Sequence, residues 1–332
     1  MSKQTLLIVV AVSLIFISCP KRPELVSSGP DEDVVRREHY FWDQSSRKWV
    51  PTIICYPAGG KAGACPLVEL NPGFLDTSFG LEYLARELAT RGYYAVVVDP
   101  DDMINIFPQQ NNKLLQIRWL ETYLELKQLE RQLWWTGYDP ETETALELLA
   151  WFYGELDGGI TDPEVLALCR QAFDYRLHNA EAVITECLRG HKWLPGRYLI
   201  NREAGAVVVG HSLGGFTALE LAGAGDHSQL AAGTVRGAIV MAPATGFFTP
   251  TDIAGVEVPT LWLIAGLDKP AINTPAEALY PYCTGPITVR KFTWFKHEDF
   301  SDTFRVIMGS KEVSFTRQEK VVQEVMNFLR EE

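Results

Sequence analysis

The stretch VVVGHSLGGFTALELA, Val207–Ala222, joins a run of valines to an apolar helix-like segment through three glycines and one serine. It contains the pattern G-x-S-x-G, which is typical of a nucleophilic serine on a sharp strand-to-helix turn. Small residues two positions before and after the serine let the neighbouring chains pass, and Gly210 and Gly214 provide them. The start of the following helix lends a positive dipole where an oxyanion would form. The stretch therefore predicts a nucleophile at Ser212.

The alternative is a glycine-rich turn that binds a phosphate group. Such turns carry G-x-G-x-x-G, or a lysine directly after the glycines, and the dinucleotide type follows the first strand of its sheet. The chain has neither pattern at Val207–Ala222, and this turn comes late in the sequence. The nucleophile interpretation is therefore favoured.

A nucleophilic serine needs a general base, and the expected chain order is serine, acid, histidine, each at a strand end. Two histidines follow Ser212. His297 comes directly after the strand-like segment VRKFTWFK, and it is the predicted base. His227 lies in the polar loop GAGDHSQ, close to the helix of Ser212, and is interpreted as a surface residue.

The acid that orients the base has two candidates. Asp268 ends the apolar run LWLIAGLD, where a buried strand enters a loop, and it is the predicted acid. Asp252, in the loop segment TPTDIAG, is the second candidate. Glu298 and Asp299 adjoin His297 in sequence and are expected to point elsewhere.

An oxyanion hole in this arrangement uses one N–H after the serine and one from an early loop. Leu213 supplies the first. The segment ELNPGFLD follows an early strand, and Gly73 lets the Phe74 N–H turn toward the pocket. The side chain of Asn71 is a further candidate donor.

The remaining sequence predicts an α/β fold with a mostly parallel central sheet flanked by helices. Residues 36–102 contain a hairpin that turns at Asp43–Arg47, followed by a strand-helix-strand unit. Residues 103–172 show no strand and read as a helical cap inserted before the strand of Ser212, ending in the helix PEVLALCRQAF. A separate helix, YRLHNAEAVITECLRG, then opens the second core segment, 173–332, which closes with the helix RQEKVVQEVMNFLREE.

The N-terminal residues have the layout of a secretory signal. A lysine precedes an apolar run, Leu6–Ile17, which is short for a membrane-spanning helix and meets Ser18-Cys19. Residues 1–18 resemble a bacterial lipoprotein signal, with Cys19 as the lipidated residue and 19–35 as a tether. An uncleaved anchor or a plain signal is the alternative. Each alternative places the protein outside the cytoplasm, and the lipoprotein signal places it in the bacterial cell envelope.

Charge and cysteine content exclude some partners. A formal net charge of -12 argues against nucleic acid, whose phosphates need a basic surface. Beyond Cys19, an odd number of cysteines remains, so at least one thiol is free or pairs with another chain. Cys55 and Cys65 bracket a glycine-rich loop and either form a disulfide or stay as buried thiols. No spacing predicts a metal site.

Four segments carry a resemblance to a known family: ELNPGFLD, GHSLGG, PTLWLIAGLDKP and KHEDFSD. They resemble the α/β-hydrolases grouped around platelet-activating-factor acetylhydrolase, dienelactone-hydrolase-like enzymes, cutinase-like polyesterases and chlorophyllase. NPGF is similar to the SPGY oxyanion turn of bacterial cutinases, and HEDFSD is closer to the acetylhydrolase pattern. The resemblance spans about residues 50–100 and 173–331. It implies an α/β-hydrolase fold and a serine esterase without cofactor or metal.

These observations predict hydrolysis of a lipid or other hydrophobic ester through Ser212, His297 and Asp268. The insertion is rich in aromatic residues, which are interpreted as its own core, or alternatively as a lid that lines an acyl pocket or touches lipid. Two other functions stay open. One is a non-catalytic surface lipoprotein on a hydrolase scaffold, and the other is a serine hydrolase of amides or peptides. Acyl length, leaving group and oligomeric state are not predicted.

Overall fold

The computed structural model describes residues 33–45, 47–73, 76–99, 163–268, 270–302 and 315–331. These residues lie in one compact unit, Glu32–Glu332. The signal at residues 1–18, Cys19 and the part of the cap before residue 163 lie outside the described residues.

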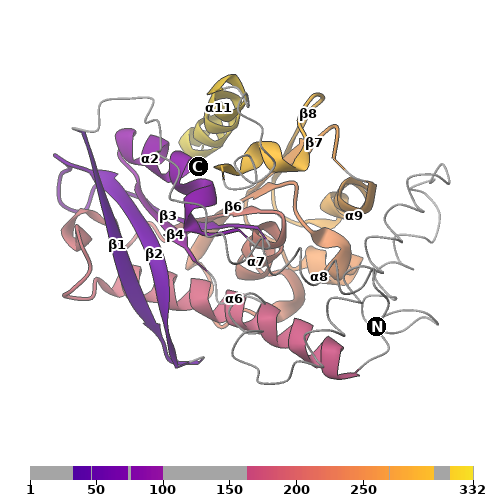
Figure 1. Cartoon of the computed structure of the whole chain (residues 1–332), viewed down its shortest axis with the longest axis horizontal. Coiled ribbons are helices and arrows are strands. Elements are labelled where there is room, and N and C mark those ends of the chain that lie inside the picture. The colour runs from indigo at the N-terminus through magenta and orange to yellow at the C-terminus, as the bar shows by residue number, and fades with distance from the viewer. Residues whose placement is uncertain are drawn as a thin grey trace, which may run out of the picture. The chain divides into compact units, whose positions relative to one another are not determined.

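An eight-stranded sheet of order β1-β2-β4-β3-β5-β6-β7-β8 forms the centre of the described residues (Figure 1). β2 runs antiparallel to both of its neighbours, and all other neighbouring strands are parallel. The mostly parallel sheet predicted from the sequence is therefore confirmed. The strands are β1 (Val34–Asp43), β2 (Lys48–Pro57), β3 (Leu67–Asn71), β4 (Tyr94–Val98), β5 (Ala206–His211), β6 (Val235–Met241), β7 (Thr260–Ala265) and β8 (Ile287–Phe292).

The central strands are apolar runs because both of their faces are covered, as is usual for parallel sheets. All residues of β3, β4, β5 and β7 are buried. Successive side chains enter opposite cores: Val208 packs on one face, and Val207 and Val209 on the other. The predicted hairpin is also confirmed, with Trp42 opposite Trp49 beside its turn.

Helices cover both faces of this sheet, as the α/β prediction requires. α2 (Glu82–Thr90) and α11 (Phe315–Glu331) pack on one face. The opposite face carries α6 (Pro163–Arg189), α7 (Leu213–Leu221), α8 (Pro250–Ala254) and α9 (Pro270–Leu279). Short 3-10 helices lie in the loops: η2 (Ser78–Leu81), η3 (Arg197–Leu199), η4 (Ala224–Asp226), η5 (Thr245–Phe247), η6 (Tyr280–Tyr282) and η7 (His297–Phe300).

The helix α6 is longer than the sequence pattern predicts (Figure 1). Two helices were expected on either side of residue 173, but one helix runs unbroken from Pro163 to Arg189. No proline or glycine interrupts this segment after Pro163, and Gly190, in the left-handed conformation, ends it. The expected end of the cap at residue 172 therefore lies inside α6. Among the described helices, none has the length and apolar composition to cross a membrane.

The structure also excludes a disulfide between Cys55 and Cys65, because both thiols are free. Cys55 packs in the core beneath α2, whereas Cys65 packs in the core beneath α6. The sheet separates the two cores, so the thiols cannot meet. Burial raises the pKa of the Cys55 thiol to about 12 and also raises that of Cys65, so both stay protonated at neutral pH.

Candidate active site

Ser212 occupies a strained turn between β5 and α7. Its φ of 55° and ψ of -119° lie where side chains other than glycine are rare, and such a conformation costs about 1–3 kcal/mol. Neighbouring segments hold the turn in place. The Ser212 N–H donates to the Met241 carbonyl at the end of β6, and its carbonyl accepts from the Ala244 N–H, both at 2.9 Å. The strain therefore persists because the end of β6 and the loop that follows fix the turn from outside.

Two glycines give this turn the space it needs. A Cβ atom on Gly210 would lie 1.9 Å from the Gly214 carbonyl oxygen, and one on Gly214 would lie 2.0 Å from the Asn71 oxygen. Neither contact is sterically possible, so the predicted role of both glycines as clearance around the serine is confirmed. Gly73 also approaches the serine, because its Cβ position lies 3.2 Å from the Ser212 Cβ. The turn after β3 therefore forms one wall beside the serine.

Asp268 and His297 come together at the ends of β7 and β8. The carboxylate Oδ2 of Asp268 accepts a hydrogen bond from His297 Nδ1 at 2.7 Å. The Asp268 side chain is fully buried, whereas 22% of the His297 side chain is exposed. A carboxylate can only accept, so Nδ1 carries the proton and Nε2 is the basic nitrogen of the neutral ring. The pair can therefore act as an oriented general base.

Ser212 is linked to this pair through its own neighbour in the chain. His211 Nε2 lies 3.0 Å from the His297 carbonyl oxygen, and the two imidazole rings are 4.8 Å apart. Within the described ranges, no hydrogen bond joins the Ser212 hydroxyl to His297. In serine hydrolases generally, the hydrogen bond between nucleophile and base is often long without substrate and shortens when substrate binds.

The competing candidates lie elsewhere and have structural roles. Asp252 caps the start of α8, where its carboxylate accepts from the Thr249 N–H at 2.7 Å. His227 contacts Glu220 at 3.0 Å, and 65% of its side chain is exposed. The two positions set aside in the sequence analysis are thus not part of the Asp268–His297 pair.

The acidic residues next to His297 also point elsewhere, as expected. Asp299 accepts from the Lys296 N–H at 2.7 Å and from Arg317 of α11, which fixes the turn that holds His297. Glu298 lies 4.0 Å from the Lys296 ammonium group.

The oxyanion donors are described in part. Leu213 is the first residue of α7, so its N–H has no partner within the helix and is available to an oxyanion. Phe74 lies outside the described residues. The suggested role of Asn71 is not supported, because its side-chain amide donates to Glu69 Oε2 at 2.6 Å inside the core.

A buried polar group that the sequence analysis missed supports the turn after β3. Arg176 of α6 is almost fully buried and donates to the Pro72 carbonyl, next to Gly73. Glu69 is also fully buried, and this burial raises the pKa of its carboxyl group to about 8. A single glutamate inside the apolar run LVELN was the available signal, since charged residues are seldom fully buried without a partner.

The segment HEDFSD ties the histidine loop to the loop after β3. The Ser301 hydroxyl donates to Asp76 Oδ2 at 2.6 Å, and the Tyr83 hydroxyl donates to the Phe300 carbonyl at 3.3 Å. Phe300 itself is fully buried. The residues after His297 therefore fix the loop that carries this histidine.

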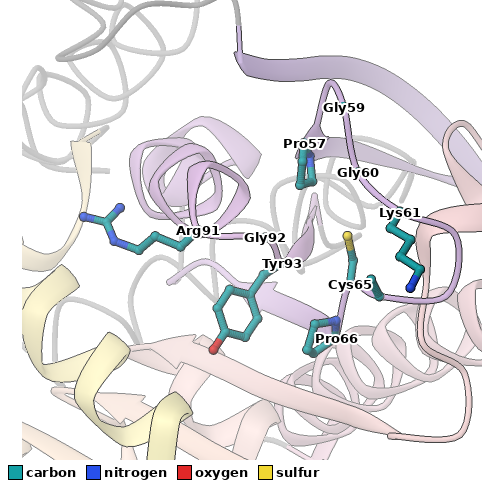
Figure 2. A pocket seen from close by; sticks show the side chains of 10 residues that line it. Pro57, Gly59, Gly60, Lys61, Cys65, Pro66, Arg91, Gly92 and Tyr93 are labelled. Atoms are coloured by element: carbon teal, nitrogen blue, oxygen red, sulfur yellow. The ribbon is translucent and has the colours of Figure 1, made fainter.

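A cavity of about 360 Å³ lies away from this site (Figure 2). It is lined by the loop from Pro57 to Pro66 and the turn from Arg91 to Tyr93, where β3 and β4 begin. Ser212 follows the end of β5, and β5 is parallel to β3. The cavity and the serine therefore lie at opposite ends of these parallel strands. Figure 2 shows the Arg91 side chain pointing away from the glycine-rich loop. The candidate site is formed by the strained Ser212 and the Asp268–His297 pair, not by this cavity.

Among the described residues, no three histidine, cysteine, aspartate or glutamate side chains are grouped as ligands for a metal ion. Neither comparison of the chain, with models of known protein families or with curated proteins, gives a match.

Proposed function

We propose that the chain is a serine hydrolase of carboxylic esters, built on an α/β-hydrolase fold and acting through an acyl-enzyme at Ser212. The observation that carries the proposal is the strained Ser212 at the end of β5, followed in chain order by the hydrogen-bonded Asp268 and His297 after β7 and β8. This order of serine, acid and histidine is the one expected of α/β-hydrolases. The signal at residues 1–18, lipidation at Cys19 and an envelope location are part of the same proposal.

The reaction follows from the roles of these groups. Ser212 Oγ attacks the ester carbonyl while His297 Nε2 takes its proton, and the Leu213 N–H stabilises the resulting oxyanion. His297 then gives the proton to the leaving alcohol, which leaves an acyl group on Ser212. Water attacks this acyl-enzyme with the same base and releases the acid. Asp268 holds the ring orientation and stabilises the imidazolium in both halves.

The surroundings of the pair support a hydrophobic substrate. Leu267 precedes Asp268 and is 49% exposed, and Trp294 lies before His297 and is 72% exposed. The Leu267 N–H donates to the Phe295 carbonyl at 2.8 Å, so the two loops run side by side. Large apolar side chains are thus presented to solvent on the loops that carry the acid and the base. Such surface favours contact with an apolar acyl group.

A fluorophosphonate probe tests the proposal, because it reacts covalently only with an activated serine. We expect labelling of the wild-type chain, and none of Ser212→Ala or His297→Ala. The matched control is His227→Ala. This variant should label like the wild type, because His227 is exposed and contacts Glu220 rather than Asp268 or His297. If the folded wild-type chain does not react with the probe, the serine-hydrolase proposal is refuted and a non-catalytic scaffold is favoured.

Nitrophenyl esters of increasing chain length, assayed beside peptide substrates, then separate esters from amides. We expect turnover of the esters, a preference for longer or more apolar acyl groups, and no peptide cleavage. Loss of Ser212 should lower turnover by about 10⁴–10⁶-fold. Efficient cleavage of peptides would instead assign an amidase or peptidase.

A further inference from the structure

His211, the residue between β5 and the nucleophile, has contacts that the reaction described above does not use. Its side chain is fully buried. Its ring lies 4.8 Å from the His297 ring and 5.9 Å from the Phe300 ring, between ring centroids. Its Nε2 lies 3.0 Å from the His297 carbonyl oxygen.

The carbonyl partner fixes the protonation state of His211. A carbonyl oxygen can only accept, so Nε2 must carry a proton and donate it. Burial first, and the charge on His297 second, lower the pKa of His211 well below its ordinary value. His211 is therefore neutral at neutral pH. A neutral neighbour matters here, because His297 becomes positively charged during the proposed reaction and a second cation beside it would oppose that step.

Several contacts restrain the loop of His297, and they reach different parts of the protein. Asp268 holds the ring from the loop after β7, and Asp299 holds the Lys296 N–H within the loop itself. Among these restraints, the His211 bond runs from the strand that carries Ser212 to the loop that carries His297. It therefore acts on the separation between nucleophile and base.

We propose that His211 is a positioning residue whose Nε2–H, bound to the His297 carbonyl, places the general base at its working distance from Ser212. The proposal rests on the proposed function for its catalytic consequence. Its structural core, the placement of His297 by His211, stands on the hydrogen bond and the ring contacts alone. The G-x-S-x-G pattern leaves this position open, so the sequence pattern itself gives no role to its residue.

The test compares His211→Gln with His211→Met. Glutamine places an amide N–H near the position of Nε2, whereas methionine has similar length and no donor. We expect His211→Met to lower kcat on a nitrophenyl ester by about 10²-fold, the typical cost of a misplaced catalytic group, with little change in KM. We expect His211→Gln to recover most of this loss. A proton NMR spectrum should keep the downfield His297 Nδ1–H resonance in His211→Gln and broaden or lose it in His211→Met.

Several outcomes would overturn the proposal. Wild-type kcat in folded His211→Met, or equal losses in both variants, would show that the hydrogen bond does not place the base. If His211→Met fails to fold, His211→Gln decides alone: a folded protein with kcat more than about tenfold below the wild type contradicts the role of the donor. Failure of the proposed function can be told apart from failure of the His211 proposal, because in the first case the wild-type chain would not be labelled by the fluorophosphonate probe. The NMR comparison would still test how His297 is held.

Discussion

Replacing Gly214 with alanine tests the strained serine turn most directly, because the added atom meets backbone and not a flexible side chain. The Cβ atom would lie 2.0 Å from the Asn71 carbonyl oxygen and 2.5 Å from that of Pro72. Cβ atoms in proteins essentially never lie within 3.0 Å of a non-bonded heavy atom. The start of α7 and the end of β3 must therefore separate by about 1 Å.

This separation has two measurable costs. Inserting a methyl group into a closely packed site that cannot yield costs about 1–3 kcal/mol of unfolding free energy. The same movement displaces Ser212 and the Leu213 N–H relative to the turn after β3. A displacement of about 1 Å in an active site costs about 10²-fold in rate. We expect Gly214→Ala to remain folded with reduced stability, and to react about 10²-fold more slowly with the fluorophosphonate probe.

Denaturant unfolding and the labelling rate measure the two costs separately. Gly59→Ala is the matched control, because no atom lies within 4 Å of its Cβ position. That variant should keep the wild-type labelling rate and lose no stability. Wild-type stability and labelling in Gly214→Ala would refute the close approach of α7 and β3, and with it the need for glycine beside the Ser212 turn.

Asp268→Asn should lower kcat by about 10⁴-fold by favouring the wrong tautomer of His297, as measured by ester turnover; an effect below tenfold would contradict the assignment. The pKa of Glu69 is raised from 4.5 to about 8, so the folded chain holds a proton that the unfolded chain releases in this range. The free energy of unfolding should therefore fall as the pH rises from 4.5 to about 8, by at most about 1.4 kcal/mol per pH unit. In denaturant titrations, the unfolding free energy of Glu69→Gln should fall less steeply over the same range. Equal slopes would contradict this. Cys55 and Cys65 should react with a thiol reagent only after unfolding; a disulfide-linked peptide in a non-reducing digest would show otherwise.

The fold was largely predictable because its signals are local and strong. Short apolar segments alternate with segments whose apolar residues recur at helical spacing. Each buried strand corresponds to one short apolar segment bounded by a turn. The hairpin turn, the parallel crossover and the position of Ser212 follow from such runs. Asp268 and His297 were predictable for the same reason, since each directly follows a buried or strand-like run.

The sequence could not predict the contacts that join distant segments. Arg176 lies in a helix whose pattern shows only an amphipathic face, and nothing local indicates that it donates to the Pro72 carbonyl. The sequence pattern predicts two helices where the structure has the single helix α6, and the absence of glycine and proline after Pro163 allows this helix to continue. The sequence suggests Asn71 as an oxyanion donor, whereas in the structure its amide turns into the core toward Glu69, a direction set by tertiary packing.

The pairing of β3 with β5 has a consequence for the assembly of the protein. These strands lie side by side in the middle of the sheet, with Asn71 opposite Gly210, although residues 72–205 separate the two strands along the chain. Gly214, two residues after Ser212, is held against Asn71 and Pro72 across this seam, so the conformation of the serine turn is not encoded by the local stretch alone. Contacts this remote form late, because a long loop must close first. The reactivity of the serine should therefore report on completed folding, and a C-terminal fragment without β3 should contain the serine motif but not react.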